Sequence, residues 1–227
     1  MIKFERLTGA IGAEVSGIDL NAPLGAATCE TIYHGLLEHL VLVFRNTGIE
    51  PGAQVRLAES LGPVMPFHPF YPSVEGQPPV AVIEDNAQSE PENACWHSDM
   101  SAMKVPPFGS VLSAQVIPPY GGDTLWCSMY AVYEALPEET RSLLENRFGV
   151  HDMHYGYEDV LDNGKSDTRA ADLEDWGSEQ GHQSQHALIM HHPATGRPLI
   201  SRTGRTPPIS KAFMLRRAAW RWSRFTP

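Results

Sequence analysis

Short apolar segments, several of them next to glycine or proline, recur along this chain of 227 residues and limit its fold more than any other feature. Runs such as residues 80–83 and 109–117 have the length of strands rather than of core helices. Between these runs lie longer stretches with helical spacing. The pattern alone therefore predicts a mixed α and β fold that is rich in short strands.

Three stretches carry helix signals. Residues 26–40 place leucine and isoleucine at helical spacing, which predicts an amphipathic helix. Residues 51–61 begin with a proline, which favours the first position of a helix, and end before a Gly-Pro pair. Residues 129–148 predict two helices that are separated at Pro137.

Strands are expected where apolar runs are short or alternate with polar residues. Residues 4–20 alternate around three glycines, which predicts short strands joined by tight turns. Further strands are predicted at residues 41–44, 80–83, 109–117, 123–126 and 187–190. Loops are expected at residues 65–76, 85–93 and 151–181, and the last two have the polar character of segments that close over a site.

A histidine and a carboxylate, His97 and Asp99, stand two residues apart in the middle of the chain. On an extended strand, residues i and i+2 point to the same side, so these two side chains can converge. An imidazole and a carboxylate are two of the three groups in the facial triad that holds non-haem Fe(II). A hydrogen-bonded surface pair has the same spacing, so the spacing alone leaves both interpretations open.

The residues around this pair carry a family resemblance. Residues 96–99 (Trp-His-Ser-Asp), followed by residues 121–126 (Gly-Gly-Asp-Thr-Leu-Trp), resemble the taurine dioxygenase family of Fe(II)/2-oxoglutarate-dependent oxygenases. Three further motifs match in the same order: residues 11–20, 68–72 and 192–197. The resemblance covers about residues 4–200. It implies an α+β fold, a double-stranded β-helix (jelly-roll) barrel with flanking helices.

The resemblance also assigns roles to individual residues. His97 and Asp99 correspond to iron ligands, and the hydroxyl of Thr124 corresponds to a contact with 2-oxoglutarate. Substrate contacts are expected from His68, Tyr71 and Asn93, which match positions that meet a sulfonate and an amine in taurine dioxygenase. The alternatives are ordinary: a locally hydrogen-bonded Thr124, and packing roles for the aromatic residues of the proline-rich loop.

The implied reaction is the hydroxylation of a small organic anion by dioxygen, with conversion of 2-oxoglutarate to succinate and carbon dioxide. An alkyl sulfonate such as taurine is the expected substrate, and an aryloxyalkanoate or an alkyl sulfate is the alternative. Fe(II) is the expected cofactor and 2-oxoglutarate the cosubstrate, with ascorbate as the reductant in vitro. The protein supplies geometry and excludes water around the metal.

The composition changes sharply after Ile200. Residues 201–227 hold seven basic residues, whereas all 27 acidic residues precede them. We expect an incomplete dioxygenase domain at residues 1–200 and a non-family basic tail at residues 201–227, for which an out-of-frame reading of the gene accounts. A genuine tail that binds an acidic partner is the alternative.

This boundary has consequences for the site. We expect the chain to lack the third iron ligand, the arginine that pairs with 2-oxoglutarate and the C-terminal barrel strands. It would then be a catalytically defective truncated barrel that acts at most as a binding protein. Three histidines are alternatives for the third ligand, although the His-Pro of the family motif is structural: His186, His191 and His192.

Charge and cysteine content narrow the remaining classes. A net charge of −10 argues against nucleic acid or a membrane surface as a partner. The three cysteines have neither disulfide-framework nor zinc spacing, which fits a reducing cytoplasm. Neither an apolar signal core at the N-terminus nor a run of membrane-spanning length is visible. Self-association into a homo-oligomer is left open.

Overall fold

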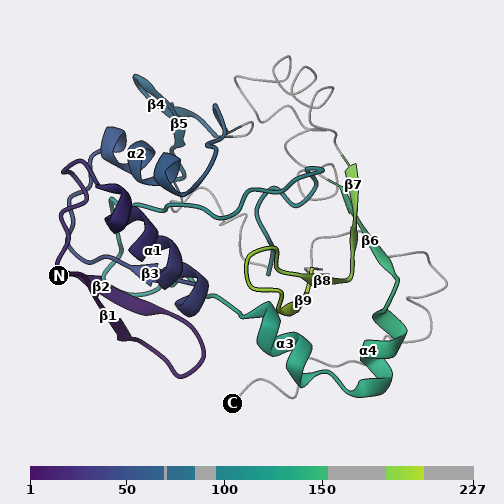
Figure 1. The fold of residues 1–227 in the computed structure, drawn as a ribbon. Helices are drawn as coiled ribbons and strands as arrows, with labels where there is room; N and C mark the ends of the chain where they lie inside the picture. The colour runs from purple at the N-terminus through teal and green to yellow at the C-terminus, as the bar shows by residue number, and fades with distance from the viewer. Residues whose placement is uncertain (69–70, 85–95, 153–182, 202–227) are drawn as a thin grey trace. The chain divides into compact units, whose positions relative to one another are not determined.

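The computed structural model describes residues 1–68, 71–84, 96–152 and 183–201. The chain divides into two compact units (Figure 1). Unit 1 comprises residues 1–90, 108–136 and 191–199, and unit 2 comprises residues 91–107, 137–190 and 200–227.

A three-stranded sheet opens unit 1. Strand β1 (Lys3–Arg6) pairs antiparallel with β2 (Ala13–Ser16), with Phe4 opposite Val15, and β2 pairs in parallel with β3 (Leu42–Val43). The short strands expected in residues 4–20 and 41–44 are therefore confirmed.

Two helices follow in unit 1, and both were predicted from sequence. Helix α1 (Ala26–His39) lies against β3 and beside helix α2 (Pro51–Leu61) (Figure 1). Pro51 occupies the first turn of α2, and Gly62 follows its end. The core of unit 1 is the cluster of Leu20, Ile32 and Leu57, each at most 5% exposed, with partly buried apolar residues packed around it.

A small hairpin extends unit 1 beyond α2. Strand β4 (Ser73–Val74) pairs antiparallel with β5 (Gln77–Ala81), which contacts α2. The strand predicted at residues 80–83 exists, but it begins three residues earlier and ends at Ala81. The loop expected at residues 65–76 includes β4.

The strands predicted at residues 109–117 and 123–126 are wrong. The structure assigns no ladder to either segment within the described part of the chain. Most of their apolar side chains are open to solvent, with Val116 92% and Leu125 72% exposed, whereas Val111 packs against the core of unit 1. A strand needs a hydrogen-bonding partner as well as β-forming residues, and these segments find none among the described strands. One anchor holds the first segment, because the Gln54 side-chain amide donates to the Val111 carbonyl at 2.8 Å.

Helix α3 (Met129–Ala135) begins at Ser128, whose Oγ accepts the Ala131 N–H. Helix α4 (Glu138–Leu144) follows in unit 2, after Pro137. The two helices predicted around Pro137 are therefore confirmed. They are separate because proline is tolerated at a helix start but not in a helix interior. Strands β8 (Ile189–His191) and β9 (Pro198–Ile200) form a hairpin whose turn includes Gly196 at a φ of 68°.

A second ladder forms the described part of unit 2. Strand β6 (Phe148–Asp152) pairs antiparallel with β7 (Gln183–Ala187), and Gly149 lies opposite His186. The strand predicted at residues 187–190 is split between the end of β7 and β8.

Several predictions fall outside the described residues: the loop at 85–93 with Asn93, most of residues 151–181, and the tail at 202–227. Within the described ranges, none of the helices has the length and apolar character needed to cross a bilayer.

Candidate metal centre

The side chains of His97 and Asp99 meet in unit 2. Their Nε2 and Oδ1 atoms are 3.1 Å apart, as the i, i+2 spacing predicted. The backbone is not the expected strand, because residues 96–98 are irregular and a turn begins at Asp99. The histidine side chain is 32% exposed and the carboxylate 61% exposed, so solvent reaches both donor atoms.

The separation of these two atoms also suits two neighbouring ligands of one metal ion. Donors that lie about 2.1 Å from a metal and at right angles to each other are about 3.0 Å apart. A neutral imidazole and a carboxylate are the donor types of the iron facial triad. Among the residues that the structure describes, no group of three His, Cys, Asp or Glu side chains is arranged to hold a metal. The pair therefore fits two positions of such a triad, and the third donor is not found within these ranges.

A tight turn follows the pair directly. The Met103 N–H donates to the Met100 carbonyl at 3.0 Å, and Met100 has a φ of 51°, in the left-handed region. Ala102, inside the turn, is 6% exposed. The imidazole of His186 on β7 faces this turn, with Nε2 at 3.0 Å from each of the Ser101 and Met103 carbonyl oxygens.

Thr124 is exposed in the irregular segment that precedes α3. It belongs to unit 1, whereas His97 and Asp99 belong to unit 2. Its role as a 2-oxoglutarate contact therefore stays a prediction.

Two of the three predicted substrate residues lie together in unit 1. The rings of His68 and Tyr71 have centroids 4.7 Å apart and are tilted by 38°. Both residues are partly buried. The structure thus brings a ring nitrogen and a phenol hydroxyl into one neighbourhood, which is compatible both with packing and with anion binding. Asn93 lies outside the described residues.

Two of the histidines considered for the third ligand, His186 and His192, make other contacts. The Nδ1 atom of His192 accepts the Ala194 N–H at 3.2 Å, within the turn after β8. The ring of His192 also packs edge-on against Tyr130 of α3. In the same hairpin, the Arg197 guanidinium lies 4.1 Å from the centre of the Tyr130 ring. This His-Pro motif thus connects the hairpin to α3, which agrees with a structural role.

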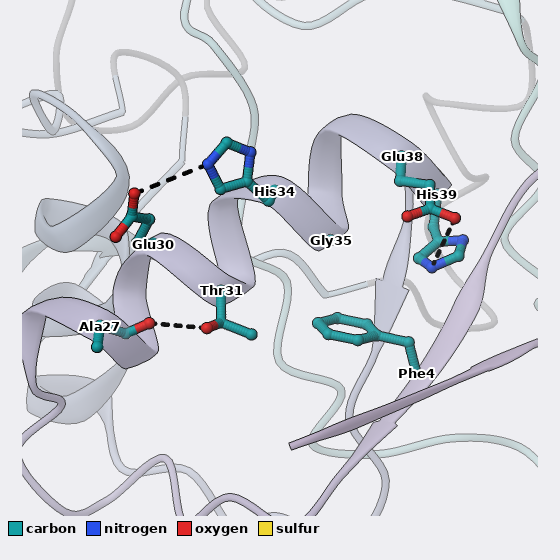
Figure 2. A pocket seen from close by; sticks show the side chains of 8 residues that line it. All are labelled: Phe4, Ala27, Glu30, Thr31, His34, Gly35, Glu38 and His39. Atoms are coloured by element: carbon teal, nitrogen blue, oxygen red, sulfur yellow. Dashed lines mark hydrogen bonds and ion pairs between the residues drawn. The ribbon is translucent and has the colours of Figure 1, made fainter. Parts of the chain in front are cut away.

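A surface hollow of about 470 Å³ is lined by residues of α1 and by Phe4 (Figure 2). Two of its lining side chains, those of Glu30 and His34, lie 3.9 Å apart. None of the six predicted site residues lines it, so it is separate from the candidate metal centre.

Sequence reasoning missed the contact that His186 makes. It considered this residue only as a candidate metal ligand. The hydrogen bonds join residues 85 and 83 positions apart, and no local pattern signals such a pairing.

A comparison with protein-family models identifies the chain. The model described as "Taurine catabolism dioxygenase TauD, TfdA family" matches residues 3–219. The chain belongs to this family. The match extends beyond Ile200, so the proposed boundary between residues 200 and 201 stays a prediction.

Two curated relatives show which activities occur in the TauD/TfdA family. An alpha-ketoglutarate-dependent sulfate ester dioxygenase from Pseudomonas putida is 34% identical over 84% of this chain and 62% of the relative. An alkylsulfatase from Acinetobacter baylyi is 32% identical over 86% of this chain and 61% of the relative. The chain thus spans about three-fifths of the length of these relatives.

The fold is shared with solved members of the family. A taurine dioxygenase from Burkholderia xenovorans matches with a TM-score of 0.70 and 28% identity, over 90% of this chain and 64% of that protein. The predicted α+β jelly-roll class is therefore confirmed by this similarity. The TauD/TfdA family consists of 2-oxoglutarate-dependent dioxygenases, and its cofactor requirement implies Fe(II).

Proposed function

We propose that this chain carries the metal-binding part of an Fe(II)/2-oxoglutarate-dependent dioxygenase that oxidises a small organic anion. One observation carries the proposal: in a member of the TauD/TfdA family, His97 Nε2 and Asp99 Oδ1 lie 3.1 Å apart, the span of two neighbouring ligands. The iron, with 2-oxoglutarate and dioxygen, supplies the oxidising chemistry when bound.

The residues of the chain have the task of binding and orientation. His97 and Asp99 would hold the metal on one face and leave its other face open to 2-oxoglutarate and dioxygen. Thr124 would donate its hydroxyl hydrogen to a carboxylate of 2-oxoglutarate. His68, Tyr71 and Asn93 would orient the substrate anion through hydrogen bonds.

For the substrate we propose an alkyl sulfonate, with taurine as the first compound to test. The neighbouring rings of His68 and Tyr71 support a compact anion, since both can donate hydrogen bonds to sulfonate oxygens. A second candidate is an alkyl sulfate ester, because the names of two relatives specify sulfate esters. An aryloxyalkanoate is the third compound class to compare.

We also propose that the 227-residue chain turns over 2-oxoglutarate only at a residual rate. Residues 201–227 contain no histidine that could serve as a third iron ligand. Two protein ligands hold Fe(II) less firmly than three do. For the location of the protein we propose the cytoplasm, because its three cysteines show no disulfide-framework spacing.

The test is succinate release by the purified chain with Fe(II), ascorbate and 2-oxoglutarate. Taurine, an alkyl sulfate and phenoxyacetate are compared as the added anion. We expect slow release that taurine stimulates and that His97→Ala and Asp99→Ala both abolish. Release that survives both substitutions would refute the metal assignment, and stimulation by only one of the other anions would refute the sulfonate proposal.

A further inference from the structure

The turn after Asp99 is held from outside its own segment. His186, the penultimate residue of β7, places Nε2 at 3.0 Å from both the Ser101 and the Met103 carbonyl oxygens. Carbonyl oxygens only accept hydrogen bonds, so Nε2 must carry a proton and donate to both. The imidazole thus joins β7 to the segment that carries His97 and Asp99, and both belong to unit 2.

This turn needs such support because its backbone is unfavourable. Met100 adopts a φ of 51°, in the left-handed region, which a residue with a side chain keeps only where the surrounding structure holds it there. Met100 directly follows Asp99, so its conformation sets the direction of the chain at the carboxylate. The first carbonyl that His186 contacts, that of Ser101, is two residues from Asp99 and within about 7 Å along the backbone.

The position of His186 is itself fixed. Its backbone is paired in the β6–β7 ladder, opposite Gly149. The ring packs edge-on against that of His151, with centroids 5.0 Å apart, and His151 is 1% exposed. A donor on a paired strand, packed against a buried ring, is a more rigid anchor than a donor on a loop.

We propose that His186 is a positioning residue for the His97–Asp99 pair: its Nε2–H clamps the Ser101 and Met103 carbonyls and thereby fixes the turn that aims Asp99 at the metal. The inference rests on the proposed metal-binding role of the pair. Groups that orient ligands without touching the metal typically change metal affinity by about 10- to 100-fold when they are lost.

The test compares two amides that differ in reach. His186→Gln places an amide N–H close to the position of Nε2, whereas His186→Asn is one methylene shorter and cannot reach both carbonyls. Gln185→Asn is the matched control, since it shortens a neighbouring side chain on the same strand by the same group and points to the opposite face. Each protein is titrated with Co(II) up to millimolar concentration and followed by the visible absorption of the bound ion. Urea unfolding is measured alongside.

We expect His186→Asn to raise the dissociation constant for Co(II) by about 10-fold or more, while His186→Gln and Gln185→Asn stay close to the parent protein. Equal affinity in parent and His186→Asn would overturn the inference. An equal loss in His186→Asn and His186→Gln would also overturn it, because the imidazole would then act through packing. A loss of Co(II) affinity of the same size in Gln185→Asn would also overturn the inference, because any shortened side chain on β7 would then have this effect.

His97→Ala separates this inference from the function on which it rests. If Co(II) binding is unchanged in His97→Ala, the proposed metal pair is wrong. If binding is lost in His97→Ala but unaffected by His186→Asn, the pair stands and only the positioning role of His186 is wrong.

Discussion

Gly35 on α1 is buried against the ring of Phe4, and a methyl group added there would collide with it (Figure 2). An ideal Cβ at this position lies 2.3 Å from Phe4 Cε1 and 2.5 Å from Cζ. Carbon atoms in contact are normally about 3.5–4.0 Å apart. The Phe4 ring would therefore have to move by about 1 Å or more, away from Gly35 and from its neighbour His39.

Two opposing effects decide the result of Gly35→Ala. Alanine in a helix interior is more stable than glycine by up to about 1 kcal/mol. Overpacking of a well-packed site typically costs about 1–3 kcal/mol. Phe4 is held by the β1–β2 pairing opposite Val15, so its backbone cannot easily move away. We expect overpacking to prevail and the free energy of unfolding to fall by about 1 kcal/mol.

The assay is urea unfolding followed by far-UV circular dichroism, with the same substitution repeated in a Phe4→Ala background. Removal of the ring leaves only the helical preference, so Gly35→Ala should then be neutral or stabilising by up to about 1 kcal/mol. The same effect in both backgrounds, or stabilisation of the parent protein, would refute the predicted steric contact.

Two further substitutions test local contacts of α3 and its neighbouring hairpin. Ser128→Ala removes the oxygen that accepts the Ala131 N–H and should lower the free energy of unfolding by about 1 kcal/mol, whereas Ser128→Asp should retain the cap; urea midpoints compare them. Arg197→Met keeps much of the aliphatic side chain but removes the guanidinium. That group lies 4.1 Å from the centre of the Tyr130 ring and pairs with Glu134 at 3.1 Å. The substitution should cost about 1 kcal/mol, and a thermal midpoint equal to that of the parent would contradict the stacking role.

The helices were predictable because their ends are encoded locally. Pro51 and Gly62 delimit α2, and Pro137 separates α3 from α4, each through a conformational preference of one residue. The convergence of His97 and Asp99 was also local, because it depends on the two-residue spacing. This explains why the pair was correctly placed although the strand expected beneath it did not form.

The wrong strands and the missed histidine have a common cause. Residues 109–117 have the composition of a strand, but strand formation depends on a partner elsewhere in the chain. His186 reaches Ser101 across 85 positions of sequence, and such contacts follow from tertiary packing rather than from spacing. Roles that depend on distant segments, including that of Thr124, cannot be read from a motif alone.

The most direct test of the central claim is a crystal of this chain grown with Mn(II) and measured at the manganese absorption edge. We expect an anomalous difference peak between His97 and Asp99, within about 2.2 Å of Nε2 and of a carboxylate oxygen. A Mn(II) peak elsewhere, with Nε2 of His97 and Oδ1 of Asp99 still in direct contact at 3.1 Å, would contradict this assignment.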